Sequence, residues 1–233
     1  RSGLPALYLN RLTSDGDILM LRRAGTTVGS IGVDNGDNIF FEGVSGGLQV
    51  ATDTLLPHKN NATADAQIDF GSTGNRWKDL YLSGGVYLGG TGAANKLDDY
   101  EEGTWTVNAY DAVTGGNVSS TSVTGRYIKI GKQVIASFDA LNDINTSGMT
   151  AGNALYITLP FSASSTGRAV GSVEVENVVF STGTSITANV TDSNGRASMR
   201  TSGSNIGKST VKIEDLTGSS ADIVNFTLSY RTD

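Results

Sequence analysis

The pattern of hydrophobic positions differs between the two parts of the chain. In the first part, apolar runs such as Ile18–Leu21, Val28–Val33 and Ile39–Phe41 are short and are separated by glycine and aspartate. Each run is too short for a stable helix. Beyond residue 103 the apolar runs are longer and alternate with polar residues. The pattern predicts a fibrous N-terminal part and a globular C-terminal part.

Alternation is clearest in two segments of the C-terminal part, Val173–Val178 and Phe226–Tyr230. A period of two is typical of a strand with one buried face and one wet face. The predicted strands of this part are Thr104–Tyr110, Gly125–Ile130, Gln133–Leu141, Ala154–Leu159, Val170–Phe180, Ser185–Val190, Ala197–Arg200, Thr210–Ile213 and Ile223–Tyr230. So many strands in one domain predict an antiparallel β-sandwich of two sheets, jelly-roll-like in topology.

In the N-terminal part, a turn signal recurs before the short apolar runs. Asp15-Gly16-Asp17 precedes one run, and Asn35-Gly36-Asp37-Asn38 precedes another, which indicates a weak internal repeat. Short strands interrupted by glycine cannot bury their apolar side chains within a single chain. We therefore expect this part to assemble with identical copies.

Composition narrows the class of protein. The 233 residues include 30 glycines and only 3 prolines, which favours strands joined by tight turns and an all-β fold. The chain has no cysteine and one histidine, His58, so a thiolate nucleophile or a histidine pair for a metal cannot be assembled within one chain. We expect no enzymatic activity, no cofactor and no metal.

Charge and hydropathy bear on the partners. A net charge of -6 opposes general attraction to nucleic acid or to anionic lipid. No run approaches the roughly 20 apolar residues that a membrane-spanning helix needs. We expect neither nucleic-acid binding nor membrane insertion. Because the chain opens at Arg1, without a methionine or a signal peptide, we expect it to be a fragment of a longer polypeptide.

Three motifs, in this order, resemble segments of bacteriophage tail fibres and related virion appendages. Ile68–Ser72 followed by Arg76–Leu82 is similar to a segment in or near the trimeric shaft of such fibres. Lys96–Trp105 resembles the connector that opens their C-terminal domain, and Gly125–Val134 resembles a hairpin of that domain. The resemblance implies a homotrimer on the virion, in contact with other tail proteins, whose tips bind a host cell-surface receptor, expected to be a glycan.

These observations give a predicted organisation. Residues 1–95 are expected to form an interwound trimeric β shaft, β-helix or β-prism like; residues 96–103 form an acidic connector; and residues 104–233 form the β-sandwich head. The predicted function is the structural and receptor-binding part of a phage tail fibre. A polysaccharide depolymerase tailspike and a purely structural virion appendage are the alternatives.

Candidate site residues follow from the predicted loops and motifs. Planar polar groups in loops suit sugar hydroxyls, and the receptor-binding candidates are Asp143, Asn145, Asp192, Asn194 and Arg196. Large apolar side chains in the shaft and connector motifs are candidates for packing within the trimer: Trp77, Leu80, Leu82 and Trp105.

Four further features each allow two interpretations, of which we favour the second. Asp98–Glu102 has carboxylates for glycoside hydrolysis or is a hydrated linker. Asp34–Asn38 is a partial calcium loop or a tight turn. His58 binds a metal on a threefold axis or is an ordinary loop histidine. Arg126, Lys129 and Lys132 contact anionic glycans or are solvated strand charges.

Overall fold

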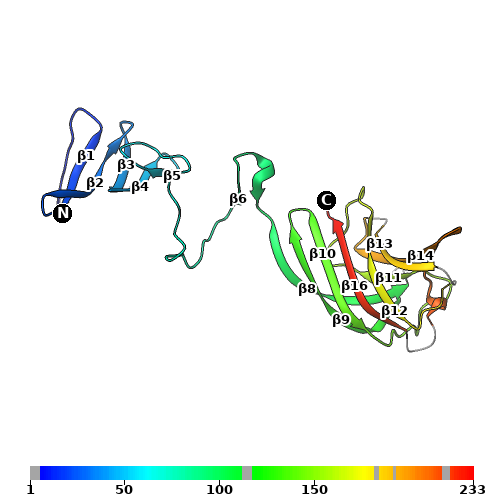
Figure 1. The fold of residues 1–233 in the computed structure, drawn as a ribbon. Helices are drawn as coiled ribbons and strands as arrows, with labels where there is room; N and C mark the ends of the chain where they lie inside the picture. Colours follow the sequence, from blue (N-terminus) through cyan, green and yellow to red (C-terminus); the bar gives the residue numbers. More distant parts are fainter. Residues whose placement is uncertain (1–5, 112–116, 181–183, 191–192, 217–220) are drawn as a thin grey trace, which may run out of the picture. The chain divides into compact units, whose positions relative to one another are not determined.

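The computed structural model describes residues 6–111, 117–180, 184–190, 193–216 and 221–233. These residues form β-strands and two short 3-10 helices (Figure 1), which confirms the predicted all-β class. The chain divides into two compact units, Arg1–Tyr81 and Leu82–Asp233. No helix in the described part is long and apolar enough to cross a bilayer.

The N-terminal unit contains a five-stranded antiparallel sheet in which each strand pairs with the next along the chain. Its strands are β1 Gly16–Arg23, β2 Thr26–Asp34, β3 Asn38–Gly43, β4 Gly46–Ala51 and β5 Thr54–His58. The turn between β2 and β3 has positive φ at Asn35 and Gly36, as a tight hairpin turn requires. The preferred interpretation of Asp34–Asn38 as a turn is therefore confirmed.

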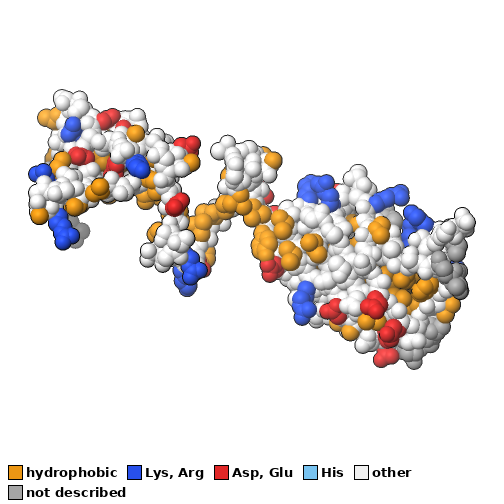
Figure 2. All heavy atoms as spheres, in the orientation of Figure 1, with side chains coloured by type: hydrophobic (Ala, Val, Ile, Leu, Met, Phe, Trp, Pro, Cys, Tyr) orange, Lys and Arg blue, Asp and Glu red, His pale blue; other side chains and the backbone are white. Residues whose placement is uncertain are grey.

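The register gives this sheet one apolar face. Directly paired residues of an antiparallel sheet share a face, and two rows of pairs are apolar from strand to strand. They comprise Leu19, Ile31, Phe41, Leu48 and Pro57 in one row and Val33, Ile39, Val50 and Leu55 in the next. We call these nine side chains the apolar face. Figure 2 shows hydrophobic side chains at the surface of the N-terminal unit.

The opposite face of the same sheet carries a buried polar cluster around His58. Both His58 and Gln49 are fully buried, and the His58 ring stacks on Phe40 with ring centroids 4.5 Å apart. His58 Nδ1 lies 2.9 Å from Glu42 Oε2, and His58 Nε2 lies 3.7 Å from Asp34 Oδ2. Gln49 Nε2 donates a hydrogen bond of 3.0 Å to Asp34 Oδ2. The sheet thus buries a polar cluster and Phe40 on one side, while much of the apolar face on the other side stays exposed.

The preferred interpretation of His58 as an ordinary loop histidine is wrong. Pro57 made the segment read as the start of a loop, but Pro57 and His58 both belong to β5, an edge strand, where proline is tolerated because one side of the strand needs no donor. Within the described residues, no group of three or more His, Cys, Asp or Glu side chains is placed to hold a metal ion.

The acidic run Asp98–Glu102 lies in and beside paired strands. The second unit begins with a hairpin of β6 Val86–Tyr87 and β7 Lys96–Leu97, with the 3-10 helix η1 Ala93–Asn95 between them. Strand β8 starts at Tyr100, within the segment predicted as connector. The Asp99 carboxylate forms an ion pair with Lys129, and Glu101 accepts a hydrogen bond from the Tyr127 hydroxyl. Neighbouring strand residues point to opposite faces, so Glu101 and Glu102 are not a facing pair of carboxylates.

The rest of the second unit is a closed antiparallel barrel instead of two separate sheets. The strand order is β11-β8-β9-β10-β16-β12-β13-β14, and β14 also pairs with β11, which closes the ring. A further strand, β15, pairs with β14 in antiparallel orientation. The bounds are β8 Tyr100–Asp111, β9 Asn117–Ile130, β10 Gln133–Leu141, β11 Leu155–Thr158, β12 Ala169–Glu176, β13 Thr184–Val190, β14 Arg196–Gly203, β15 Ile206–Thr210 and β16 Asp222–Arg231.

Most of the predicted strands of this unit are confirmed, with one clear exception. Thr210–Ile213 is not a strand of its own: it ends β15 and leads into the 3-10 helix η2 Ile213–Asp215. The two-sheet prediction fails because alternation determines which side chains point inward and not which strands pair at the edges. Both a sandwich and a barrel satisfy the same alternation.

The barrel core follows the alternation of β10 and β16. Ala136 pairs with Leu228, and Phe138 pairs with Phe226, and all four side chains are buried. The rings of Phe138 and Phe226 stack with centroids 4.8 Å apart. The predicted inward face of Phe226–Tyr230 is therefore confirmed.

Tyr230 closes one end of this core and makes the barrel sensitive to alkaline pH. Its hydroxyl donates to Phe161 O at 3.0 Å and accepts from Phe161 N at 3.2 Å. Burial raises the pKa of Tyr230 to about 12. The folded barrel therefore retains the phenolic proton at a pH where the unfolded chain loses it. This contribution to stability is fully present below pH about 10 and is lost as the pH rises through about 12.

Tyr230→Phe is expected to lower the free energy of unfolding at neutral pH by about 1–2 kcal/mol, because the Phe161 backbone groups lose their partner. The variant should also lose less stability than the wild type between neutral and strongly alkaline pH. Denaturant unfolding of both proteins across that range checks this prediction, and an equal alkaline loss in both would contradict it.

Candidate functional site

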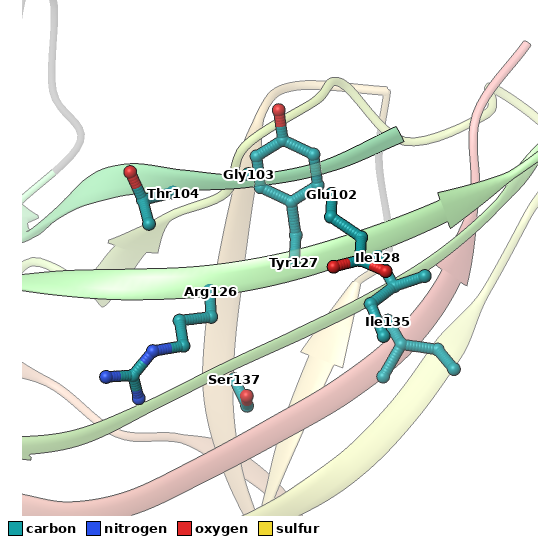
Figure 3. Close-up of a pocket in the computed structure, with 8 residues that line it drawn as sticks. All are labelled: Glu102, Gly103, Thr104, Arg126, Tyr127, Ile128, Ile135 and Ser137. Atoms are coloured by element: carbon teal, nitrogen blue, oxygen red, sulfur yellow. The ribbon is translucent and has the colours of Figure 1, made fainter. Parts of the chain in front are cut away.

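A hollow of about 520 Å³ lies on the outer side of β8, β9 and β10 (Figure 3). It is open to solvent, and both polar and apolar side chains surround it. Its lining residues are Glu102, Gly103, Thr104, Arg126, Tyr127, Ile128, Ile135 and Ser137.

Two rows of paired residues form the outward-facing part of the hollow. In the first, Ile128 pairs with both Glu102 and Ile135; in the second, Arg126 pairs with both Thr104 and Ser137. The β9–β10 hairpin, whose turn contains Gly131 at φ +55°, sets this register. Strand alternation then places these side chains on the outer surface, away from the barrel core.

Two inward-facing glycines each pair with a large ring, one between the two rows and one next to the Arg126 row. Gly103 pairs with Tyr127, and Gly125 pairs with Trp105. A Cβ at Gly103 would lie 2.5 Å from Tyr127 Oη, and one at Gly125 would lie 2.5 Å from the Trp105 ring. Glycine is therefore required at both positions for the rings to lie over the facing strand. The Tyr127 hydroxyl donates to Glu101, and this hydrogen bond raises the pKa of Tyr127.

The groups at the hollow are suited to binding a polar ligand with an apolar surface. Within the described part of the chain, no group forms a hydrogen bond or an ion pair with the Arg126 guanidinium. Its donors are free for a ligand, with hydroxyl groups on both sides. Ile128 and Ile135 are 40% and 45% exposed. Glu102 accepts a hydrogen bond from Tyr100 and is the hollow's one carboxylate.

The predicted receptor-binding residues do not come together. Asp143 and Asn145 lie between β10 and β11, at the end of the barrel where Leu141 pairs with Ile223. Asn194 lies between β13 and β14, at the opposite end, where Ala169 pairs with Val190. Asp192 lies outside the described residues.

Several of these candidates have structural contacts of their own. The backbone N–H of Asp143 donates to Asp222 at 2.6 Å, and Asn145 Oδ1 accepts from the Ser147 N–H at 2.9 Å. Arg196 pairs with Thr158 across the β11–β14 seam, and its guanidinium lies 4.1 Å from the centre of the Tyr156 ring. This cation–π contact supports the closure of the barrel.

The four candidates for trimer packing differ in their surroundings. Trp105 packs against the barrel core and donates from Nε1 to Thr158 O at 3.1 Å. Trp77 is 64% exposed and stacks on Phe70 with centroids 4.8 Å apart. Leu80 and Leu82 are also exposed. Trp77, Leu80 and Leu82 therefore remain available to another molecule, whereas Trp105 contacts its own barrel.

The sequence allows two interpretations of Arg126, contact with anionic glycans or a solvated strand charge, and the favoured second one gives it no place in a site. The strand assignment of Gly125–Ile130 contained the needed signal, since it implies that Arg126 and Ile128 face the same way. The partners Thr104 and Ser137 become visible only when the register is known. Comparisons of the chain with protein-family models, with curated proteins and with solved structures gave no match.

Proposed function

We propose that this chain is the structural and receptor-binding part of a bacteriophage tail fibre, that it works as a homotrimer, and that its barrel attaches the virion to a glycan on the host cell surface. The motifs at Ile68–Leu82, Lys96–Trp105 and Gly125–Val134 support this proposal through their resemblance to tail fibres. The division into a strand-rich N-terminal unit and a separate barrel is consistent with a fibre that carries a head.

The observation that carries the receptor-binding role is the hollow on the barrel. A sugar ring presents hydroxyl groups at its rim and C–H groups on its faces. Arg126 donates hydrogen bonds, Glu102 accepts them, and the hydroxyls of Thr104 and Ser137 do both. Ile128 and Ile135 provide an apolar surface for the ring face. The hollow thus matches both kinds of group on a saccharide.

The openness of the hollow implies weak binding by each head. A ligand on an open surface buries less area than one in a deep cleft, and affinity depends on a few well-placed contacts. In a homotrimer, three hollows bind a repetitive surface glycan together, and tethered sites raise overall avidity by about 10²–10⁴-fold. Firm attachment then requires assembly as well as recognition.

Excess purified chain is expected to slow adsorption of the corresponding phage to its host cells, since both compete for one receptor. Arg126→Ala should weaken this competition about tenfold or more, because hydrogen bonds to a charged group are worth about 1.5–3 kcal/mol. Arg168→Ala is the matched control, because Arg168 is an exposed arginine of the same barrel outside the hollow.

The outcomes separate the three functions. No competition by the wild-type chain would contradict receptor binding and favour a purely structural appendage. Release of new reducing ends from host capsule or lipopolysaccharide would favour the depolymerase. Equal weakening by Arg126→Ala and Arg168→Ala would show that the hollow is not the binding site.

A further inference from the structure

We infer that the apolar face of the five-stranded sheet is the surface through which copies of this chain assemble. The inference rests on the proposed homotrimer and adds the surface that builds it. The occupants of the face are the same faces of the two other copies, which meet through side chains around the threefold axis of the trimer. The strands of each copy keep the pairing within their own sheet.

Much of the apolar face is exposed, as such an interface requires. Its most exposed members, Ile39, Phe41, Val50 and Leu55, leave 43%, 48%, 45% and 60% of their surface in contact with solvent. Leu19 and Leu48 are also exposed, at 37% and 40%, so six of the nine side chains form two adjacent rows of exposed apolar groups. Contiguous exposed apolar surface of this kind marks sites of interaction with another molecule.

The charge distribution favours an identical partner. None of the nine side chains is charged, whereas Asp34, Glu42 and His58 lie on the opposite face of the same sheet. Each chain carries a net charge of -6, so copies repel one another wherever their charged surfaces meet. An uncharged face is where copies can approach closely. Rows of Leu, Ile and Val from three such sheets can pack against one another around the threefold axis.

The segment that follows β5 contacts the polar face of the sheet and not the apolar face. After β5, the backbone N–H groups of Asn60 and Asn61 donate to the Glu42 carboxylate at 2.5 and 3.2 Å, and Glu42 belongs to the polar face. The polar side is thereby enclosed while the apolar face stays bare. A sheet that buries histidine and glutamine and exposes phenylalanine and leucine is consistent with apolar burial that another molecule completes.

Aspartate substitutions on the face test the inference. Phe41→Asp at its centre and Leu55→Asp on the edge strand each place a charge among identical charges of the other copies. Val44→Asp is the matched control: Val44 is 75% exposed and lies in the β3–β4 turn, outside the face. In sedimentation velocity at micromolar concentration, the wild type and Val44→Asp should have the trimer mass. Phe41→Asp and Leu55→Asp should fall to one third of it.

A second measurement covers the case in which an aspartate variant unfolds its own sheet. The chain has no cysteine, so Leu48→Cys places a single thiol on the face. A bis-maleimide reagent that spans about 10 Å, the distance between packed sheets, should join copies of Leu48→Cys and leave Val44→Cys largely unlinked. Val44 is more exposed than Leu48, 75% against 40%, so weaker cross-linking at Val44→Cys does not result from poorer reagent access.

The outcomes distinguish this inference from the proposed function. A wild-type trimer whose mass is unchanged in both aspartate variants, with no cross-linking at Leu48→Cys, overturns the inference and leaves the homotrimer in place. A monomeric wild type overturns both. A wild-type monomer that associates only with a different virion protein assigns the face to that protein and overturns the inference.

Discussion

Replacing Phe226 with alanine is expected to lower the free energy of unfolding of the barrel by about 3–5 kcal/mol. The side chain is 1% exposed and stacks on Phe138 in the centre of the core. Its removal leaves a cavity between β10 and β16, and strands paired along their length cannot collapse to fill it. Urea unfolding followed by circular dichroism measures the loss.

Thr227→Ala is the matched control for this prediction. Thr227 follows Phe226 in β16 but points to the outer surface, so its truncation should change stability by no more than about 0.5 kcal/mol. Comparable losses in both variants would contradict the assignment of inward and outward faces. The residues of β16 that face the barrel interior would then have to be reassigned.

Glu42→Ala is expected to destabilise the N-terminal sheet by about 1–3 kcal/mol, the usual effect of leaving polar groups without a hydrogen-bond partner. Its carboxylate lies 2.9 Å from the buried His58 Nδ1 and accepts two backbone hydrogen bonds from the loop after β5. Without it, the buried His58 Nδ1 loses its nearest polar neighbour and the two amides lose their acceptor. Hydrogen exchange of the amides in residues 38–58 should accelerate accordingly.

Two controls define what this result means. Asp37→Ala removes an exposed carboxylate from the turn before β3 and should leave exchange in residues 38–58 nearly unchanged. Glu42→Gln retains an acceptor for the Asn60 and Asn61 amides but loses the charge, so its effect should be intermediate. If Glu42→Ala behaves like Asp37→Ala, the polar cluster does not stabilise the sheet.

The strands of the barrel could be predicted because their alternation is local. In β10 and β16, alternate residues are buried in the core and exposed to solvent. The predicted bounds of both strands agree closely with those in the structure. The closure of the barrel could not be predicted, because it depends on three residue pairs between β11 and β14. Those pairs join segments far apart in sequence and have no pattern of their own.

The N-terminal sheet was harder to predict for a different reason. Gly46-Gly47 at the start of β4 and Pro57 in β5 interrupt the apolar pattern, so neither strand was predicted. The buried state of His58 depends on Phe40, Glu42 and Asp34 from two other strands. A histidine next to proline in a polar stretch gives no local sign of such partners. The hollow on the barrel was missed similarly, since its rows exist only once β8, β9 and β10 are in register.

The hollow is built on strands and not on loops, and this has a consequence for how recognition can change. Its outward residues alternate with inward ones that form or border the core, and two of its strands, β8 and β9, have the longest pairing in the barrel. A ligand therefore meets a preorganised surface and loses little affinity to ordering it. Under the receptor-binding function proposed above, new specificities arise by exchanging outward side chains one at a time, while the inward residues keep the scaffold intact. Adaptation of the proposed fibre to an altered host then needs neither insertions nor a new fold.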